Sequence, residues 1–352
     1  MRGRKPALLA VALALTASVP AAAADLATSG TQNGRIVFRR YLDVAKTTGA
    51  IFTVNPNGSK VTQVSRPRNG VIDTEPDWSA DGTKIAFERQ LPCPAGGSRD
   101  GMNDTCDLVY TVNRNGKGLW PLVACQFDVA HSSASPASRC VGVDQPGWSP
   151  DGRRIAFQYN LVDPNYSDSL ELNAGIWVVD ADGGNAHQVT QRTPGNSWDF
   201  GPQWSPSGDK LAFFRLDLHG NNEAIYTVNV DGTSEIRLTP KTLNAANPNW
   251  SPDGKWVLFT GEAGDGSVNI YKVHSDGSSL TNVTRQGPGG FHYLSASFSP
   301  NGAMIATGRT PGKGLEGAAD VVTMKADGSH VRPVTKSRLW DSGADWGTAP
   351  LR

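Results

Sequence analysis

Short apolar segments alternate with turn-forming segments along almost the whole chain. The apolar segments are four to seven residues long and rich in β-branched and aromatic residues, and between them stand Asn-Gly, Asp-Gly or Ser-Pro-Asp-Gly. Pro presets φ at the second position of a turn, Gly accepts a positive φ, and Asn-Gly and Asp-Gly favour tight hairpins. The pattern therefore predicts short antiparallel strands joined by tight turns.

One part of this pattern recurs as an internal repeat. Each copy has an aromatic residue, a turn of the Ser-Pro-Asp-Gly type and a strand of the Ile-Ala-Phe type. The aromatic residues are Trp78, Trp148, Trp204, Trp250 and Phe298, with a truncated copy at Trp346. They are 70, 56, 46, 48 and 48 residues apart, and we expect them to pack between repeats.

A second motif alternates with the first and consists of an Ile-Tyr-x-Val strand followed by Asp-Gly or Asn-Gly. Its copies span residues 51–58, 109–116, 176–183, 225–232, 270–277 and 321–328, and a short strand-like tail follows most of them. The two motifs together predict four antiparallel strands per repeat. A four-stranded unit that recurs about every 45–50 residues is typical of a propeller blade.

The two ends of the chain complement each other. Residues 35–40 resemble an Ile-Ala-Phe strand without its preceding partner, and residues 343–347 resemble that missing partner. Pairing them removes two open strand edges. We therefore predict an all-β fold, a six-bladed β-propeller of four-stranded antiparallel blades closed by the C-terminal strand, with residues 33–352 as a single domain. An open β-solenoid and a β-sandwich are the alternatives.

The first 24 residues have the pattern of a secretory signal peptide. Basic residues precede the apolar run Ala7–Val19, and Ala22–Ala24 offer small residues for cleavage before Asp25. The run is shorter than the roughly 20 apolar residues that a membrane span needs. Residues 25–32 are predicted to be a short linker. We expect a secreted or periplasmic protein with no membrane span.

Composition and charge narrow the class further. Lys+Arg 33 against Asp+Glu 33 gives zero net charge, so the chain lacks the basic field that would hold nucleic acid or an anionic membrane. Gly 39 and Pro 23, with only 19% charged residues, also argue against a helical bundle. The chain is expected to be a globular monomer.

Four cysteines lie within one stretch, and an even number in an exported chain favours disulfides over a metal site. They are Cys93, Cys106, Cys125 and Cys140, which allow three pairings. The pairs Cys93–Cys106 and Cys125–Cys140 are favoured because each closes one Gly/Ser-rich insertion. A zinc site is the alternative, but no Cys-x-x-Cys spacing is present.

The paired motifs resemble the repeats of the TolB-like six-bladed propellers, which are similar to WD40 repeats. The resemblance rests on Trp-Ser-Pro-Asp-Gly-x-x-Ile-Ala-Phe and Ile-Tyr-x-Val-x-x-Asp-Gly and covers about residues 33–347. TolB is periplasmic and binds partner proteins of the cell envelope, so the resemblance implies a similar binding role. Similar repeats also occur in a pectic-oligosaccharide lyase family and in the propeller domains of certain serine peptidases.

Candidate site residues stand five positions before each aromatic residue, where the chain is expected to enter the central axis. These positions, with the polar residues next to them, are Asp73, Val143, Asp144, Asp199, Asn244, Ala245, His292, Tyr293 and Asp341. Several carboxylates around one mouth could hold Ca²⁺ through oxygen ligands. The alternative is a rim of solvated, loop-capping aspartates.

The sequence holds little that indicates catalysis. No Gly-x-Ser-x-Gly elbow is present, the six histidines are scattered, and only His292 stands near the predicted mouth. We therefore favour an exported, non-catalytic propeller that binds a protein or a cell-envelope glycan, with no cofactor beyond a possible Ca²⁺. The alternative is an extracellular propeller enzyme, a metal-dependent lyase or hydrolase acting on a polysaccharide.

Overall fold

A computed structural model describes residues 32–92, 105–123, 140–162, 172–191, 197–220, 222–262, 264–311 and 318–351. The regular structure of this part is β-strand, apart from the 3-10 turn η2 (Lys241–Leu243). In the residues so described, no helix has the length and apolar character needed to cross a membrane. The all-β class predicted from the sequence is confirmed.

In the second half of the chain, each set of four consecutive strands forms one antiparallel sheet. The first sheet contains β12 (Ser197–Trp204), β13 (Lys210–Asp217), β14 (Asn222–Asn229) and β15 (Ile236–Arg237). The second contains β16 (Ala246–Trp250), β17 (Trp256–Glu262), β18 (Val268–His274) and β19 (Thr281–Asn282). The third contains β20 (His292–Phe298), β21 (Met304–Thr310), β22 (Asp320–Lys325) and β23 (Arg332–Pro333).

The remaining strands join in a twelve-stranded sheet in which the same four-strand order recurs. One group is β24 (Asp341–Trp346), β1 (Ile36–Tyr41), β2 (Gly49–Val54) and β3 (Thr62–Gln63). The next is β4 (Ile72–Trp78), β5 (Lys84–Pro92), β6 (Thr105–Asn113) and β7 (Trp120–Val123). The last is β8 (Cys140–Trp148), β9 (Arg154–Val162), β10 (Leu172–Asp180) and β11 (His187–Gln188). Single parallel contacts, β2 with β4 and β6 with β8, join the groups.

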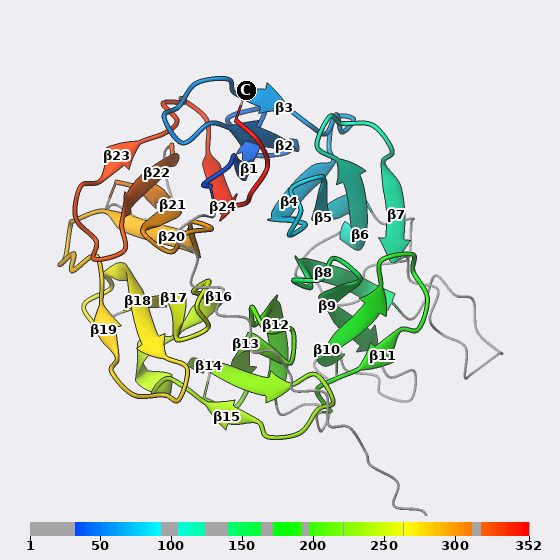
Figure 1. Ribbon diagram of the computed structural model, residues 1–352, viewed down its shortest axis with the longest axis vertical. Coiled ribbons are helices and arrows are strands. Elements are labelled where there is room, and N and C mark those ends of the chain that lie inside the picture. Colours follow the sequence, from blue (N-terminus) through cyan, green and yellow to red (C-terminus); the bar gives the residue numbers. More distant parts are fainter. Residues whose placement is uncertain are drawn as a thin grey trace, which may run out of the picture.

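The groups follow one another around a common centre (Figure 1). The strands nearest that centre are called the inner strands and are β4, β8, β12, β16, β20 and β24. The two ends of the chain pair as predicted, because β24 runs antiparallel to β1 with Trp346 opposite Ile36 and Asp341 opposite Arg40. The group that opens the described chain is thus completed by the last strand.

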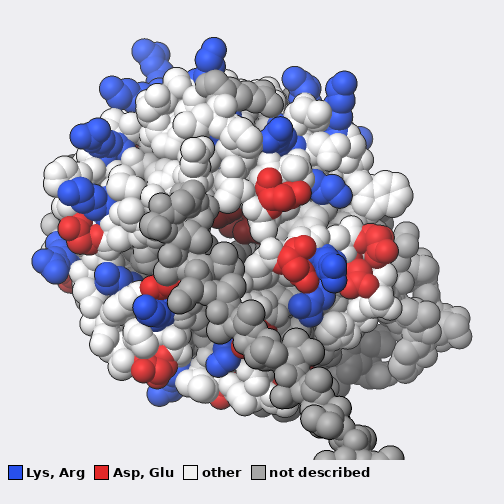
Figure 2. Space-filling model, viewed as in Figure 1, with Lys and Arg blue, Asp and Glu red and all other residues white. Residues whose placement is uncertain are grey.

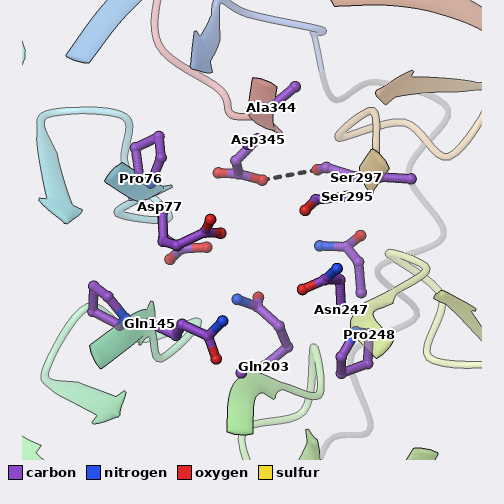
Figure 3. A pocket seen from close by; sticks show the side chains of 16 residues that line it. Pro76, Asp77, Gln145, Gln203, Asn247, Pro248, Ser295, Ser297, Ala344 and Asp345 are labelled. Atoms are coloured by element: carbon purple, nitrogen blue, oxygen red, sulfur yellow. Dashed lines mark hydrogen bonds between the residues drawn. The ribbon is translucent and has the colours of Figure 1, made fainter. Parts of the chain in front are cut away.

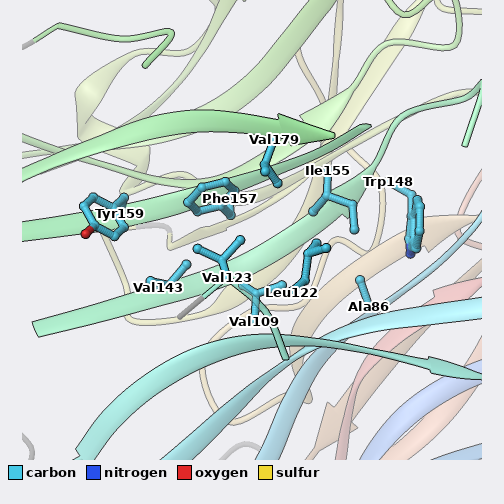
Figure 4. Close-up of a cluster of buried hydrophobic side chains, with 10 residues drawn as sticks. All are labelled: Ala86, Val109, Leu122, Val123, Val143, Trp148, Ile155, Phe157, Tyr159 and Val179. Carbon is cyan, nitrogen blue, oxygen red and sulfur yellow. The ribbon is translucent and has the colours of Figure 1, made fainter. Parts of the chain in front are cut away.

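The aromatic residue that ends each inner strand packs between neighbouring groups. Figure 4 shows one such cluster, in which Trp148, Ile155 and Phe157 of one group meet Ala86 and Val109 of the group before it. The Ile-Ala-Phe strands supply many of the fully buried side chains of these clusters, and the neighbouring strands supply the others. The repeated sequence motif therefore records the packing of one sheet on the next.

The turn after each aromatic residue is held by its own side chains. At the turn after Trp148, Ser149 Oγ donates to Asp151 Oδ1 over 2.6 Å and accepts the Arg154 backbone N–H over 2.9 Å. Gly152 takes a φ of 67°, which is strained for residues with a Cβ. The Ser-Pro-Asp-Gly repeat thus fixes the chain reversal at the aromatic end of the inner strand.

The predicted cysteine pairs fall outside what the structure describes. Cys93 and Cys125 lie outside the described residues, and the side chains of Cys106 and Cys140, in β6 and β8, are not described. The pairing Cys93–Cys106 and Cys125–Cys140 stays a prediction. The expected signal peptide, residues 1–24, also lies outside the described residues.

Candidate functional site

Each inner strand carries a β-bulge shortly before its aromatic residue. In β4, Thr74 pairs with Glu88 and Asp77 pairs with Ala86, so Glu75 and Pro76 together stand opposite a single residue. The pairings of the other inner strands shift at the corresponding place, except that the shift in β20 lies one residue earlier. A bulge adds one residue to the strand and so shifts the alternation of side chains between the two faces of the sheet. Residues beyond the bulge therefore point to the opposite face from the one expected for a regular strand.

In every inner strand except β20, the first bulge residue is held in an uncommon backbone conformation. Its φ is 44° at Glu75, 50° at Gln145, 55° at Gly201, 54° at Asn247 and 63° at Gly343. Positive φ is costly for side chains with a Cβ, by roughly 1–2 kcal/mol, and it persists only where the surroundings enforce it. The bulges are therefore built features that aim specific side chains at the centre.

These side chains line a central channel (Figure 3). Its narrow part is a cavity of about 70 Å³, and each inner strand lines it with two or all three of the residues that precede the aromatic residue. It opens into a wider part of about 280 Å³, lined by the aromatic residues of every inner strand except β12 and by residues of the turns that follow them. Five residues line both parts and are called the belt: Asp77, Gln203, Asn249, Ser297 and Asp345.

Belt side chains also tie neighbouring groups of strands together at four places. Asp77 Oδ2 accepts the Trp148 N–H over 2.7 Å, and Asp345 Oδ2 accepts the Trp78 N–H over 2.9 Å. Asn249 and Ser297 accept the corresponding N–H groups of Phe298 and Trp346 over 3.0 and 3.1 Å. Ser297 Oγ donates in turn to Asp345 Oδ1 over 2.8 Å. The channel wall is thus pre-organised by hydrogen bonds between groups.

One inner strand has glycine where its neighbours have a polar belt residue. A Cβ at Gly147 would lie 2.6 Å from the Pro202 carbonyl oxygen and 3.3 Å from Gln203 Nε2. The gap lets Gln203 pass this strand and hydrogen-bond to Asp77 on the next one. Glycine is needed here for the close approach of another side chain, and the belt continues across it.

The belt brings together the buried carboxyl group of Asp77 and the half-buried carboxyl group of Asp345. Burial, and then the charge of Asp345, raise the pKa of Asp77 well above its usual value, while hydrogen bonds from Trp148 and Gln203 oppose this rise. Burial likewise raises the pKa of Asp345, against hydrogen bonds from Trp78, Ser297 and Trp346. Two such groups favour the uptake of a proton or of a cationic partner.

The residues predicted to form the mouth lie elsewhere. The set five positions before each aromatic residue is buried, with no side chain more than 3% exposed, and none of it lines either part of the channel. The bulge is the reason, because it turns the third and first residues before the aromatic residue toward the centre instead. This placement differs from the rim expected at Asp73, Val143, Asp199, Ala245, Tyr293 and Asp341.

The three aspartates of that set are each held by an arginine. Asp73 pairs with Arg89 over 2.6 Å, and Asp341 pairs with Arg40 over 2.7 Å, in each case from directly across the sheet. The third, Asp199, meets Arg215 over 2.6 Å in the same register. All three carboxylates are 0% exposed. These three aspartates are therefore engaged in separate ion pairs and do not form a shared Ca²⁺ site.

The other predicted residues have separate surroundings. Asn244 is exposed and ends η2 with a φ of 41°. His292 is half-buried at the first position of β20, and Tyr293 packs in a hydrophobic cluster with Phe298. None of the three lines the channel.

Asp144 differs, since it joins a group of acids. Carboxyl oxygens of Glu88, Asp107 and Asp144 lie within 4.8 Å of one another. Glu88 is only 4% exposed, and burial, then the charges of Asp107 and Glu75, raise its pKa to about 8. Among the described residues, this is the group with the spacing and oxygen ligands that a hard cation uses.

Comparison with known proteins identifies the family to which the repeated motif belongs. A family model, PD40, described as the TolB beta propeller domain, matches residues 108–346. The chain belongs to this family. The resemblance inferred from the repeat motifs is thereby confirmed.

The curated relatives of this TolB-type propeller match it over part of their own length. The uncharacterized peptidase YuxL of Bacillus subtilis is 31% identical over 155 residues, which are 44% of this chain and 22% of that protein. The uncharacterized protein Atu1656 of Agrobacterium fabrum is 26% identical over 171 residues, which are 48% and 53% of the two chains. The chain thus spans about a fifth to a half of the length of these relatives.

Solved structures with the same fold include TolB proteins. TolB from Acinetobacter baumannii matches with a TM-score of 0.64 and 17% identity, over 91% of this chain and 67% of that one. A putative TolB from Agrobacterium tumefaciens gives 0.57 and 18%, over 91% and 94%. An oligogalacturonate lyase in complex with manganese gives 0.52 and 14%, over 82% and 71%. At these identities the matches support the fold alone.

Proposed function

We propose that this TolB-type propeller is an exported, non-catalytic binding module that takes a protein or a cell-envelope glycan at the wide end of its channel. The observation that carries the proposal is the belt, a polar wall fixed by hydrogen bonds between groups of strands. Among the described residues that line the channel there is no histidine and no cysteine. A fixed, polar, histidine-free opening suits recognition better than metal-assisted or nucleophilic chemistry.

The finer architecture belongs to the same proposal. We take the groups of four strands as the six blades of a closed propeller, with β24 as the strand that completes the ring. The β24–β1 pairing supports this, as do the bonds that Asp345 makes to Trp78 on one side and to Ser297 on the other. The protein is proposed to be a monomer that carries two disulfides after export.

Blocking the wide opening tests the proposed function. Ala80 is exposed and lines this opening, whereas Ala45 is exposed in the loop between β1 and β2, at the opposite end of the strands. Ala80→Trp should lower the capture of envelope proteins or arrayed glycans by at least tenfold, and Ala45→Trp should leave it unchanged. The measurement is capture by the immobilised mature protein, with melting temperature as the folding control.

Two results would overturn the proposal. One is capture that Ala45→Trp abolishes and Ala80→Trp does not, which would place the ligand on the opposite face. The other is turnover of a polysaccharide or peptide by the purified protein that Ala80→Trp suppresses. That result would favour the enzyme hypothesis instead.

A further inference from the structure

The charge in the central channel is of one sign. Glu75, Asp77 and Asp345 line it, and none of the described residues lining its two parts is lysine, arginine or histidine. In Figure 2 acidic atoms are visible inside the hole near the centre of this face. Low-dielectric walls strengthen the field of such charges along the channel, so a positively charged group would be attracted to it.

The two belt carboxylates have acceptor capacity left. Asp345 accepts hydrogen bonds from Ser297 on Oδ1 and from Trp78 on Oδ2, and the backbone N–H of Trp346 makes a third. Each carboxylate oxygen can accept two. Figure 3 shows Asp77 and Asp345 extending toward the middle of the narrow part, so a donor placed there would meet both.

An uncharged acceptor belongs to the wall of the same narrow part. The Gln145 Oε1 atom is buried and accepts no hydrogen bond, and Figure 3 shows the Gln145 side chain extending into the narrow part. An unpaired buried acceptor is unfavourable, so a ligand that brings N–H donors would relieve it. Asn247 and Asn249 line the same part and add amide groups to its wall.

The shape of the channel indicates which kind of positively charged group could enter it. A wide part of about 280 Å³ leads past the belt into a narrow part of about 70 Å³, which suits a slender chain with a charged tip. The described acids that lie close enough to share a bare metal ion are Glu88, Asp107 and Asp144, none of which belongs to the belt. A guanidinium offers five N–H donors in a fixed plane, more than an ammonium, and matches several separated acceptors.

We propose that the channel receives an arginine side chain of a polypeptide partner, inserted from the wide end, with its guanidinium between Asp77, Asp345 and Gln145. This inference rests on the proposed function and specifies the chemistry of the partner. It commits to a protein rather than a glycan. A lysine side chain shares the charge, and the experiment separates the two.

The probe is a capped pentapeptide, Gly-Gly-X-Gly-Gly, titrated by calorimetry at pH 7.5 and low salt. X is arginine, lysine or citrulline, which has the shape of arginine without its charge. The arginine peptide should bind at least tenfold more tightly than the citrulline peptide and more tightly than the lysine peptide. Asp77→Asn and Asp345→Asn should each weaken it at least tenfold, while Asp231→Asn, at an exposed turn, should not.

A further variant keeps the test valid if a belt aspartate proves necessary for folding. Gln145→Met removes the amide without altering the carboxylates and should weaken the arginine peptide about threefold. Melting temperatures of all variants report folding. Equal binding of the arginine and citrulline peptides, or binding unaffected by these substitutions in folded protein, would overturn the inference.

The experiments distinguish a failure of the arginine inference from a failure of the proposed binding function. If a protein partner is captured equally by wild type, Asp77→Asn and Asp345→Asn, the binding function stands and the arginine inference is wrong. If the arginine peptide binds with the expected pattern but no macromolecule is captured, the inference stands and the proposed function is wrong.

Discussion

Replacing Arg215 by alanine is expected to lower the free energy of unfolding by about 3–5 kcal/mol. Arg215 is 9% exposed and donates Nε and Nη2 to the two oxygens of the fully buried Asp199, and Nη1 and Nη2 to Glu235. Its guanidinium also lies 4.3 Å from the centre of the Tyr226 ring. Alanine would leave the buried carboxylate without its cation, which is the main source of the loss.

An exposed ion pair between η2 and the end of β13 supplies the control. Lys241 pairs with Asp217, but their side chains are 38% and 28% exposed, so Lys241→Ala should cost at most about 1 kcal/mol. Urea titration of both variants gives the comparison. The double variant Asp199→Asn with Arg215→Met should recover part of the loss. A similar small effect for Arg215→Ala and Lys241→Ala would show that the buried pair contributes little.

Replacing Glu88 by glutamine is expected to stabilise the protein in mild alkali. The raised pKa of Glu88, about 8, means that the folded protein keeps this proton after the unfolded chain has lost it. The unfolding free energy of the wild type therefore falls as the pH rises from about 4.5 to about 8 and levels off above that. Glutamine does not ionise, so it removes this part of the slope.

The gain in unfolding free energy from Glu88→Gln is expected to depend strongly on pH. Glu88→Gln should exceed the wild type by on the order of 2–4 kcal/mol at pH 8.5 and should match it near pH 5. Gln90 Nε2, which donates to Glu88 Oε1 over 2.7 Å, keeps an acceptor in the variant. Asp231→Asn, at an exposed turn, should leave this pH dependence unchanged. Parallel pH profiles for the wild type and Glu88→Gln would contradict the account of this cluster.

The strand pattern could be predicted from the sequence because it follows from local chemistry. The Ser-Pro-Asp-Gly and Asp-Gly turns mark the chain reversals, and the incomplete motifs at residues 35–40 and 343–347 indicated that the ends pair. Periodicity of this kind reports which segments form strands. It does not report where a strand departs from regular alternation.

The residues that line the channel were not predicted, because the sequence pattern did not reveal the bulges. The candidate positions were counted on an unbulged strand, so they fell on buried residues such as Asp73 instead of on Glu75 and Asp77. A signal was present in the repeated x-Pro-x-Trp pattern at residues 75–78, 145–148, 201–204 and 247–250, in which x is polar or glycine, since Pro in a strand marks an edge or a bulge.

Long-range pairing explains why the ion pairs of Asp341 and Asp199 could not be predicted from the sequence. Asp341 meets Arg40 across 301 positions of sequence, and Asp199 meets Arg215 only when two adjacent strands take their observed register. Without that register these aspartates look like free acids at a mouth. Their partners become visible only once the sheet is assembled.

The central claim is that the ligand docks over the wide end of the channel. Hydrogen exchange of backbone amides, compared with and without a captured partner, tests it most directly. The account predicts protection in the turns at residues 79–82, 149–152 and 251–254 and no change in the loop at residues 42–48. Protection confined to residues 42–48 or to the outer strands β3, β15 and β19 would contradict it.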